Sequence, residues 1–132
     1  MAAAVVAVAL LASCGKAAGG RTVRAGGEEV PAARLERAAT ALCTARDQAK
    51  GDVKEANSTF YDRSHDDLHT IARALDPVDR AAAARLLEDK ERVETDFRAG
   101  VASAQVVSDL DTLARSTRAG LAALSISVPS CT

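Results

Sequence analysis

Both histidines of this 132-residue chain lie in one short stretch, YDRSHDDLH, residues 61–69. His65 and His69 are four residues apart, so on an α-helix their side chains lie one turn apart on the same face. A helix presents two imidazoles to one metal ion in this arrangement. Asp62 and Asp66 each precede a histidine by three residues, within reach as further ligands or as carboxylates that orient the imidazole rings. Nitrogen and oxygen donors suit Zn(II), Cu(II) or Ni(II), so the stretch is a candidate metal site.

A solvated helix surface is the alternative interpretation of the same residues. Counted at about 100° per residue from the apolar stripe of this segment, His65 falls on the flank and the other three side chains fall on the outer face. Specific metal binding would then need a carboxylate from a neighbouring helix, with Glu88 or Glu91 as the candidates. A polar surface rich in Asp and His needs no ligand to explain it.

No other arrangement of residues indicates catalysis. The sequence contains no Gly-x-Ser-x-Gly, no Gly-rich phosphate-binding loop and no Cys-x-x-Cys-His motif. Residues 86–98 mix charges at helical spacing, and we expect a solvated face with pairs such as Glu88 with Arg92 and Glu94 with Arg98. We therefore expect no enzyme activity.

The composition limits the class of protein. Seventeen basic residues stand against eighteen acidic ones, and aromatic residues make up only 2% of the chain. Nucleic-acid binding normally needs a basic surface and aromatic side chains for stacking, so nucleic acid is not an expected partner. With 132 residues, the chain has room for one small domain, whose core must consist of Ala, Leu and Val.

The elements that would position these residues are helices. Apolar residues recur at helical spacing from Pro31 onward, with breaks at Gly51, at residues 76–77 and at Gly100. Four helices with short connections predict an all-α, up-down four-helix bundle. The apolar stripes include Leu35, Leu42, Phe60, Leu68, Leu75, Leu86, Val93, Leu110 and Leu121.

A second fold stays open, because the stripe from Leu35 to Leu75 keeps to one face across Gly51. A continuous first helix would give a three-helix bundle or a long helical hairpin. In favour of a break, Asp52 and Glu55 form a capping-box pattern directly after Gly51.

The beginning of the chain predicts where the protein is located. An apolar run of about a dozen residues is too short to span a bilayer, and it ends in small residues as a secretory signal does. Leu11-Ala12-Ser13-Cys14 resembles the lipobox of bacterial lipoproteins. The resemblance implies that residues 1–13 are a signal peptide, and that Cys14 carries a diacylglycerol and becomes the amino terminus. Residues 1–4 contain no Lys or Arg, which departs from the signal-peptide pattern, and an ordinary signal peptide with an incidental Cys14 is the alternative.

Residues 14–30 follow as a stretch rich in Gly and small side chains. With no hydrophobic period, this stretch predicts a flexible tether between the lipidated cysteine and a helical domain at residues 31–132.

The two remaining cysteines, Cys43 and Cys131, form an even pair in a chain exported to an oxidising compartment, which predicts one disulfide. A disulfide also favours the four-helix arrangement over a three-helix bundle, because the tail then leaves the last helix beside the start of the first and can return to Cys43. An elongated helical hairpin would satisfy the disulfide as well.

Together these features predict a lipid-anchored helical binding or interaction module on the extracytoplasmic face of the cell membrane. Its expected partners are the membrane, through Cys14, and an envelope protein. The alternative function is a metal-binding or metal-sensing bundle that uses His65 and His69.

Overall fold

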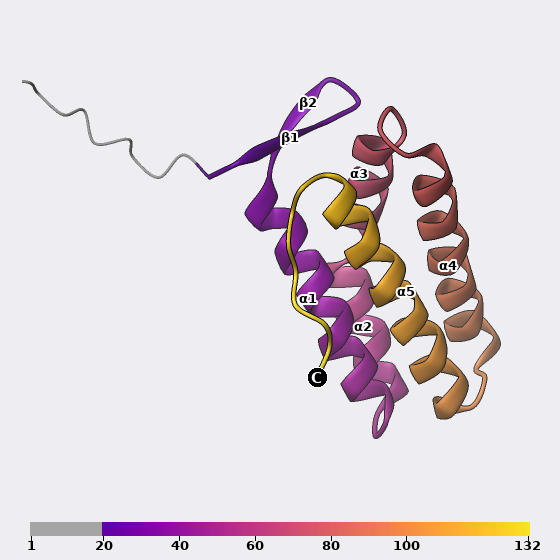
Figure 1. The fold of residues 1–132 in the computed structure, drawn as a ribbon. Helices are drawn as coiled ribbons and strands as arrows, with labels where there is room; N and C mark the ends of the chain where they lie inside the picture. Colours follow the sequence, from indigo (N-terminus) through magenta and orange to yellow (C-terminus); the bar gives the residue numbers. More distant parts are fainter. Residues whose placement is uncertain (1–19) are drawn as a thin grey trace, which may run out of the picture.

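The structure, a computed structural model, describes residues 20–132. A two-stranded hairpin is followed by five helices (Figure 1). The elements are β1 (Thr22–Ala25), β2 (Glu28–Pro31), α1 (Ala32–Ala49), α2 (Val53–Arg63), α3 (His65–Leu75), α4 (Arg80–Ala99) and α5 (Ser103–Ala123). The predicted all-α class is confirmed apart from this small hairpin, and the number of helices is five where four were predicted.

The break between α1 and α2 is confirmed at Gly51. The α1 helix ends at Ala49, and the Asp52 side chain caps α2 by accepting hydrogen bonds from the amides of Lys54 and Glu55 at 2.9 and 3.1 Å. Such a cap satisfies amides that have no partner within the helix. A continuous first helix is therefore wrong, and with it the three-helix and long-hairpin alternatives.

The second predicted helix is interrupted once more, at Ser64. The backbone of Ser64 has φ −129° and ψ −41°, outside the helical region. Its buried hydroxyl donates a hydrogen bond to the Ala38 carbonyl of α1 at 2.9 Å. A short polar side chain that bonds to a neighbouring helix competes with regular helical geometry. The apolar spacing continues unchanged across Ser64, so the sequence pattern did not reveal the interruption.

Capping residues set the limits of α4. Asp79 accepts a hydrogen bond from the Ala82 amide at 2.9 Å and is the N-cap of α4, whereas Asp76 is the C-cap of α3. Gly100 ends α4 in the left-handed conformation, with φ 64°, which glycine adopts without steric cost.

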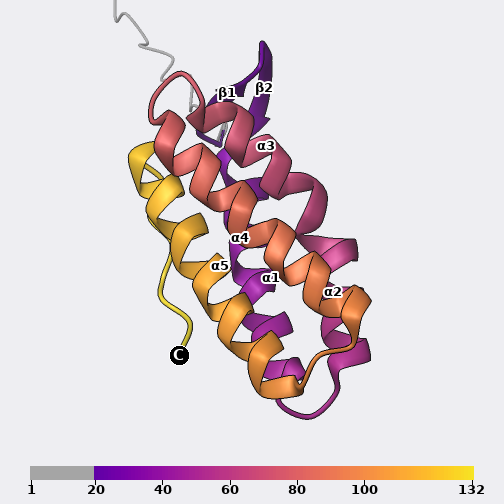
Figure 2. The same cartoon turned by 90° about the vertical axis from the view of Figure 1, so that its right-hand side faces the viewer.

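The helices lie side by side along the length of the molecule (Figures 1 and 2). The α1 helix packs against α2 and α5, and α4 packs against α5 and α3. The stripe positions named above are buried in the core between them, whereas four further apolar residues of these stripes are only partly buried and pack against the core: Val53, Phe97, Val107 and Leu124. Gly120 of α5 permits a close approach, because a Cβ atom there would lie 2.7 Å from Leu75 Cδ1.

The prediction of a flexible tether is wrong for residues 22–30, which form the hairpin together with Pro31. Val23 pairs with Val30, and the two-residue turn consists of Gly26 and Gly27, both with positive φ. Val30 is buried completely, and the hairpin contacts α1 through β2 and α3 through β1. A Gly-Gly pair between two valine-containing segments is a hairpin signal, but the surrounding small residues obscured it. The predicted signal peptide at residues 1–13 and the predicted lipidation of Cys14 lie outside the described residues.

The disulfide between Cys43 and Cys131 is confirmed, with the two Cα atoms 5.3 Å apart. After α5 the tail runs back along α1 (Figure 1). Ile126 is buried in the core, and Arg46 of α1 donates a hydrogen bond to the Thr132 carbonyl at 2.6 Å. The tail therefore joins α5 to α1 by packing as well as by the covalent bond.

Candidate functional site

The three aromatic residues of the chain gather around His65. Its ring centroid lies 5.1 Å from that of Tyr61 and 5.9 Å from that of Phe60, and Phe60 lies 5.6 Å from Phe97 of α4. The His69 ring is 5.3 Å from that of His65. The predicted proximity of the two imidazoles on one helix face is therefore present in the structure.

Both nitrogens of His65 are already engaged. Nδ1 lies 2.9 Å from Asp66 Oδ1, and Nε2 lies 2.7 Å from Glu94 Oε1. A ring nitrogen that donates to a carboxylate has no lone pair for a metal ion, so metal binding at either nitrogen would displace one of these partners. The carboxylate that faces His65 from α4 is thus Glu94, not Glu88 or Glu91.

The same Glu94 oxygen accepts a hydrogen bond from Lys90 Nζ at 2.7 Å. The Lys90 side chain is only 5% exposed, so its ammonium group depends on Glu94 for compensation. Glu94 therefore pairs with Lys90 and His65, and the expected pair with Arg98 is wrong. The other expected pair, Glu88 with Arg92, is confirmed at 3.5 Å.

Electrostatic effects in this cluster have identifiable causes. Burial alone would raise the pKa of Glu94, but the hydrogen bonds and positive charges of Lys90 and His65 outweigh it and lower the pKa. A hydrogen bond and positive charge from His65 lower the pKa of Asp66. Burial and the positive charges of Lys90 and His65 lower the pKa of His69. The lowered pKa favours the neutral form of the His69 ring.

The four predicted metal ligands are not assembled into one site. His65, His69 and Asp66 are neighbours, but Asp62 accepts a hydrogen bond from Ser58 at 3.0 Å on the exposed face of α2. Across residues 20–132, no group of three or more His, Cys, Asp or Glu side chains is arranged to hold a metal ion. The contact between His65 and Glu94 instead links α3 to α4.

A second buried polar cluster lies between α4 and α5. The carboxyl groups of Asp96 and Asp109 face each other, and Gln105 donates a hydrogen bond to Asp109 at 2.7 Å. Within residues 20–132, Asp96 Oδ2 is buried without a hydrogen-bond partner. Burial, followed by the hydrogen bond to Asp109 and its negative charge, raises the pKa of Asp96 to about 6, whereas Arg92 acts in the opposite direction.

We expect Asp96→Asn to stabilise the protein by about 1–2 kcal/mol at pH 7. The unfolded aspartate has a pKa near 3.9, so the folded wild type binds the extra proton between about pH 4 and pH 6. Its stability falls as the pH rises through this window and levels off above it. The asparagine variant lacks this loss, so its advantage should grow from pH 4.5 to pH 7.5 in urea unfolding. The exposed Asp62→Asn is the control, and an advantage of Asp96→Asn that does not change with pH would contradict the argument.

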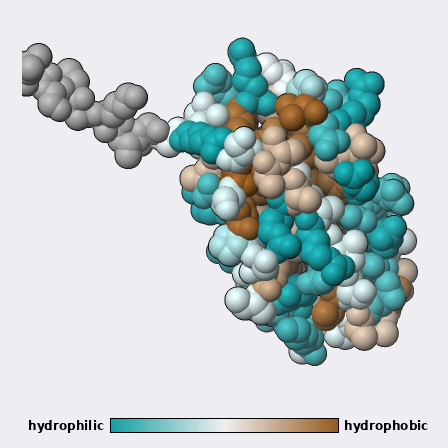
Figure 3. Space-filling view, in the orientation of Figure 1, coloured by the Kyte–Doolittle hydropathy of each residue, from teal (hydrophilic) through white to brown (hydrophobic). Residues whose placement is uncertain are grey.

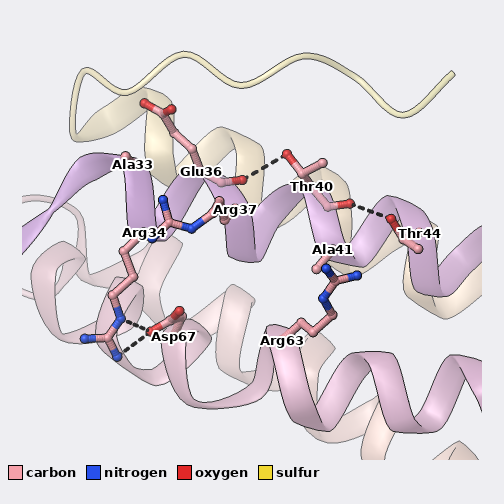
Figure 4. Close-up of a pocket in the computed structure, with 9 residues that line it drawn as sticks. All are labelled: Ala33, Arg34, Glu36, Arg37, Thr40, Ala41, Thr44, Arg63 and Asp67. Atoms are coloured by element: carbon pink, nitrogen blue, oxygen red, sulfur yellow. Dashed lines mark hydrogen bonds and ion pairs between the residues drawn. The ribbon is translucent and has the colours of Figure 1, made fainter. Parts of the chain in front are cut away.

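An open groove of about 830 Å³ lies between α1 and the α2–α3 segment (Figure 4). On α1 the groove is lined in part by small alanine side chains, and charged side chains border it. Arg34 reaches across from α1 to Asp67 of α3, with Nη2 and Oδ1 2.6 Å apart. The residues that line the groove are Ala33, Arg34, Glu36, Arg37, Thr40, Ala41, Thr44, Arg63 and Asp67.

Two further arginines border this groove, Arg37 on α1 and Arg63 on α2. Neither makes a hydrogen bond or ion pair with another residue of the described part of the chain. No sequence pattern indicates this site, because the two arginines belong to different helices and neither is part of a motif. Only the packing of α1 on α2 brings them to one groove.

Large apolar side chains are rarely exposed. Among residues 20–132, Tyr61, Val78 and Leu87 are the large hydrophobic residues with substantial exposure, and they lie on α2, the α3–α4 turn and α4. Figure 3 shows a largely hydrophilic face, with hydrophobic residues gathered mainly toward the hairpin end. Within the same residues, none of the helices combines the length and apolar character that crossing a bilayer requires.

No protein-family model, no curated protein and no solved structure matches this chain.

Proposed function

We propose that this chain is a lipid-anchored, extracytoplasmic binding module without catalytic activity. The apolar run that ends in Leu11-Ala12-Ser13-Cys14 supports export and lipidation at Cys14. The Cys43–Cys131 disulfide supports an oxidising compartment.

The arginine-lined groove is the observation that favours binding. Both ring nitrogens of His65 are engaged by carboxylates, whereas the guanidinium groups of Arg37 and Arg63 have no ion-pair partner within residues 20–132. Unsatisfied donors on the walls of a groove favour recognition of a polar ligand. The proposed activity is therefore binding at the side of the helical domain.

We also infer that α2 and α3 act as one kinked unit, so that the domain works as an up-down bundle of four units. Hydrogen bonds of the helical type continue on both sides of the interruption, from the Ser64 amide to Phe60 and from the Leu68 amide to Ser64. Such a unit would hold Arg63 and Asp67 at fixed positions along the groove.

The anchor would hold the domain near the membrane. Thr22, the first residue of the hairpin, is eight residues after Cys14, a reach of at most about 28 Å for an extended chain. The hairpin lies at one end of the helical domain (Figure 1), so this end would face the lipid surface and the groove would remain accessible at the side.

Cys14→Ser tests the anchor. In a bacterial host, we expect the wild-type chain to partition into the detergent phase of a Triton X-114 extraction, with the mass of a chain that starts at Cys14 and carries a diacylglycerol. The Cys14→Ser chain should lose both properties, because serine offers no thiol for lipidation. Ser13→Ala keeps a small residue before the cysteine and should behave as the wild type. Detergent partitioning that survives in Cys14→Ser would reject the lipid anchor.

A further inference from the structure

The groove between α1 and the α2–α3 segment is elongated. Its lining on α1 extends from Ala33 to Thr44, and a helical segment of that length rises about 16 Å. The side chains of Ala33 and Ala41 on this wall are small, so they leave room for a chain that lies along α1. A groove of this length fits an elongated occupant better than a compact one.

One arginine of the groove is neutralised and two are not. Nε and Nη2 of Arg34 lie 2.7 and 2.6 Å from the same carboxylate oxygen of Asp67. Arg37 and Arg63 have no ion-pair partner within residues 20–132. The Glu36 carboxylate projects away from Arg63 (Figure 4), so it does not neutralise that side of the groove. Two positive charges therefore remain for an anionic partner.

The two unpaired guanidinium groups lie at different places along the groove. Figure 4 shows the Arg37 group beside Arg34 and the Arg63 group near Ala41. Arg34 and Ala41 are two helical turns apart on α1, which corresponds to about 10 Å along the helix axis. The arrangement therefore suits a longer molecule with two separate negative groups, rather than one small anion that contacts both arginines.

The pair of Arg34 with Asp67 shows which negative group suits these side chains. Two N–H groups of one guanidinium there contact a carboxylate, whose planar shape matches the planar set of donors. An acidic peptide presents such carboxylates at intervals along its chain. In an extended chain, residues three positions apart are separated by about 10 Å, so two acidic side chains at that interval match the two arginines.

Two features of the groove favour a peptide over a nucleic acid. The carboxylates of Glu36 and Asp67 also line it, and they would repel the closely spaced phosphates of a nucleic acid. The aromatic side chains on which bases stack are not among its lining residues.

From this arrangement we propose that the groove binds an extended acidic segment of a partner protein, with one carboxylate on Arg37 and a second, three residues along the segment, on Arg63. This inference deepens the proposed binding function and rests on it. The hydroxyls of Thr40 and Thr44 donate to carbonyls of their own helix, at 3.0 and 3.5 Å. The two arginines are thus the main side-chain donors for the segment.

Nuclear magnetic resonance titration at low salt tests the proposal on the isotope-labelled full chain, purified in a non-ionic detergent with its disulfide intact. The probe is a short Gly/Ser peptide with blocked ends and two glutamates three residues apart. We expect its binding to shift the amide signals of residues 33–44 and 63–67. Arg37→Gln/Arg63→Gln should raise the Kd at least about 5-fold, because both guanidinium–carboxylate contacts are lost. Neither arginine makes an ion pair within residues 20–132, so circular dichroism of this variant should match the wild type.

Arg24→Gln/Arg85→Gln is the matched control. These two exposed arginines lie outside the groove and also lack an ion pair within residues 20–132, so the control removes the same net charge and should bind the peptide as the wild type does. An isomeric peptide with adjacent glutamates tests the spacing. It should bind at least about 3-fold more weakly, because its two carboxylates are too close together to reach both arginines.

Four results would overturn the proposal. These are no detectable binding of the probe, equal losses in the two double variants, equal affinity for the two isomeric peptides, and tighter binding of a thymidine trinucleotide, which carries the same two negative charges. The last result would assign the groove to nucleic acid. Each of them leaves the Cys14 anchor intact, because detergent partitioning tests the anchor separately.

Discussion

Replacing both Cys43 and Cys131 by serine is expected to lower the free energy of unfolding by about 4–5 kcal/mol. The disulfide closes a loop with a sequence separation of 88 residues, and the chain-entropy model gives a loss of this size for a loop of that length. A small domain has a total stability of about 5–15 kcal/mol, so the change removes a large share of it. Urea unfolding monitored by circular dichroism measures the effect.

Chemical reduction provides an independent control. Reducing the wild-type protein with dithiothreitol should give the same loss as the double serine variant, since both open the same loop. Cys14→Ser should leave the unfolding free energy unchanged. A reduced protein as stable as the oxidised one would show that the packed tail, through Ile126 and the Arg46–Thr132 hydrogen bond, holds α5 to α1 without the covalent bond.

The second large effect is expected at Glu94. Glu94→Gln should destabilise the protein by about 3 kcal/mol, because it leaves the Lys90 ammonium group, in a side chain only 5% exposed, without its counter-charge. The lowered pKa of Glu94 means that the carboxylate contributes stability fully above its ordinary pKa near 4.5. The contribution is lost as the pH falls below that value.

A double-mutant cycle separates the buried pair from general damage. Lys90→Met with Glu94→Gln should recover most of the loss, because a methionine fills the space of the lysine without a charge. Glu88→Gln, at an exposed i,i+4 pair with Arg92, should change stability by less than about 0.5 kcal/mol. A single Glu94→Gln as mild as Glu88→Gln would show that water or His69 compensates Lys90.

The sequence contained a signal for this buried pair that the apolar pattern concealed. Lys90 occupies the step between Leu86 and Val93 on the buried stripe of α4, at a spacing of four and then three residues. A charged residue at such a position must find a buried partner, and Glu94 is one turn away. The nearby charges of residues 86–98 made the whole segment resemble a solvated face.

The candidate sites differ in how much of them is local. The His65–His69 spacing is a property of one helix, so the sequence predicted their proximity correctly. The His65 ring is engaged by Asp66 of its own helix and by Glu94 of α4, and the cross-helix partner Glu94 also binds Lys90. The arginine groove is entirely non-local, because its residues come from three helices and no periodicity relates them.

By itself, the sequence determined the helical class, the break at Gly51, the buried apolar stripes and the pairing of Cys43 with Cys131. The first three features depend on short-range spacing and on capping residues, which are local properties of the sequence. The cysteine pairing follows from the number of cysteines. Only the tertiary structure decided which polar side chains meet across helices, and where a buried serine interrupts a continuous apolar stripe. Such contacts depend on the rotation and separation of packed helices, since a rotation of one residue, about 100°, exchanges a buried face for an exposed one.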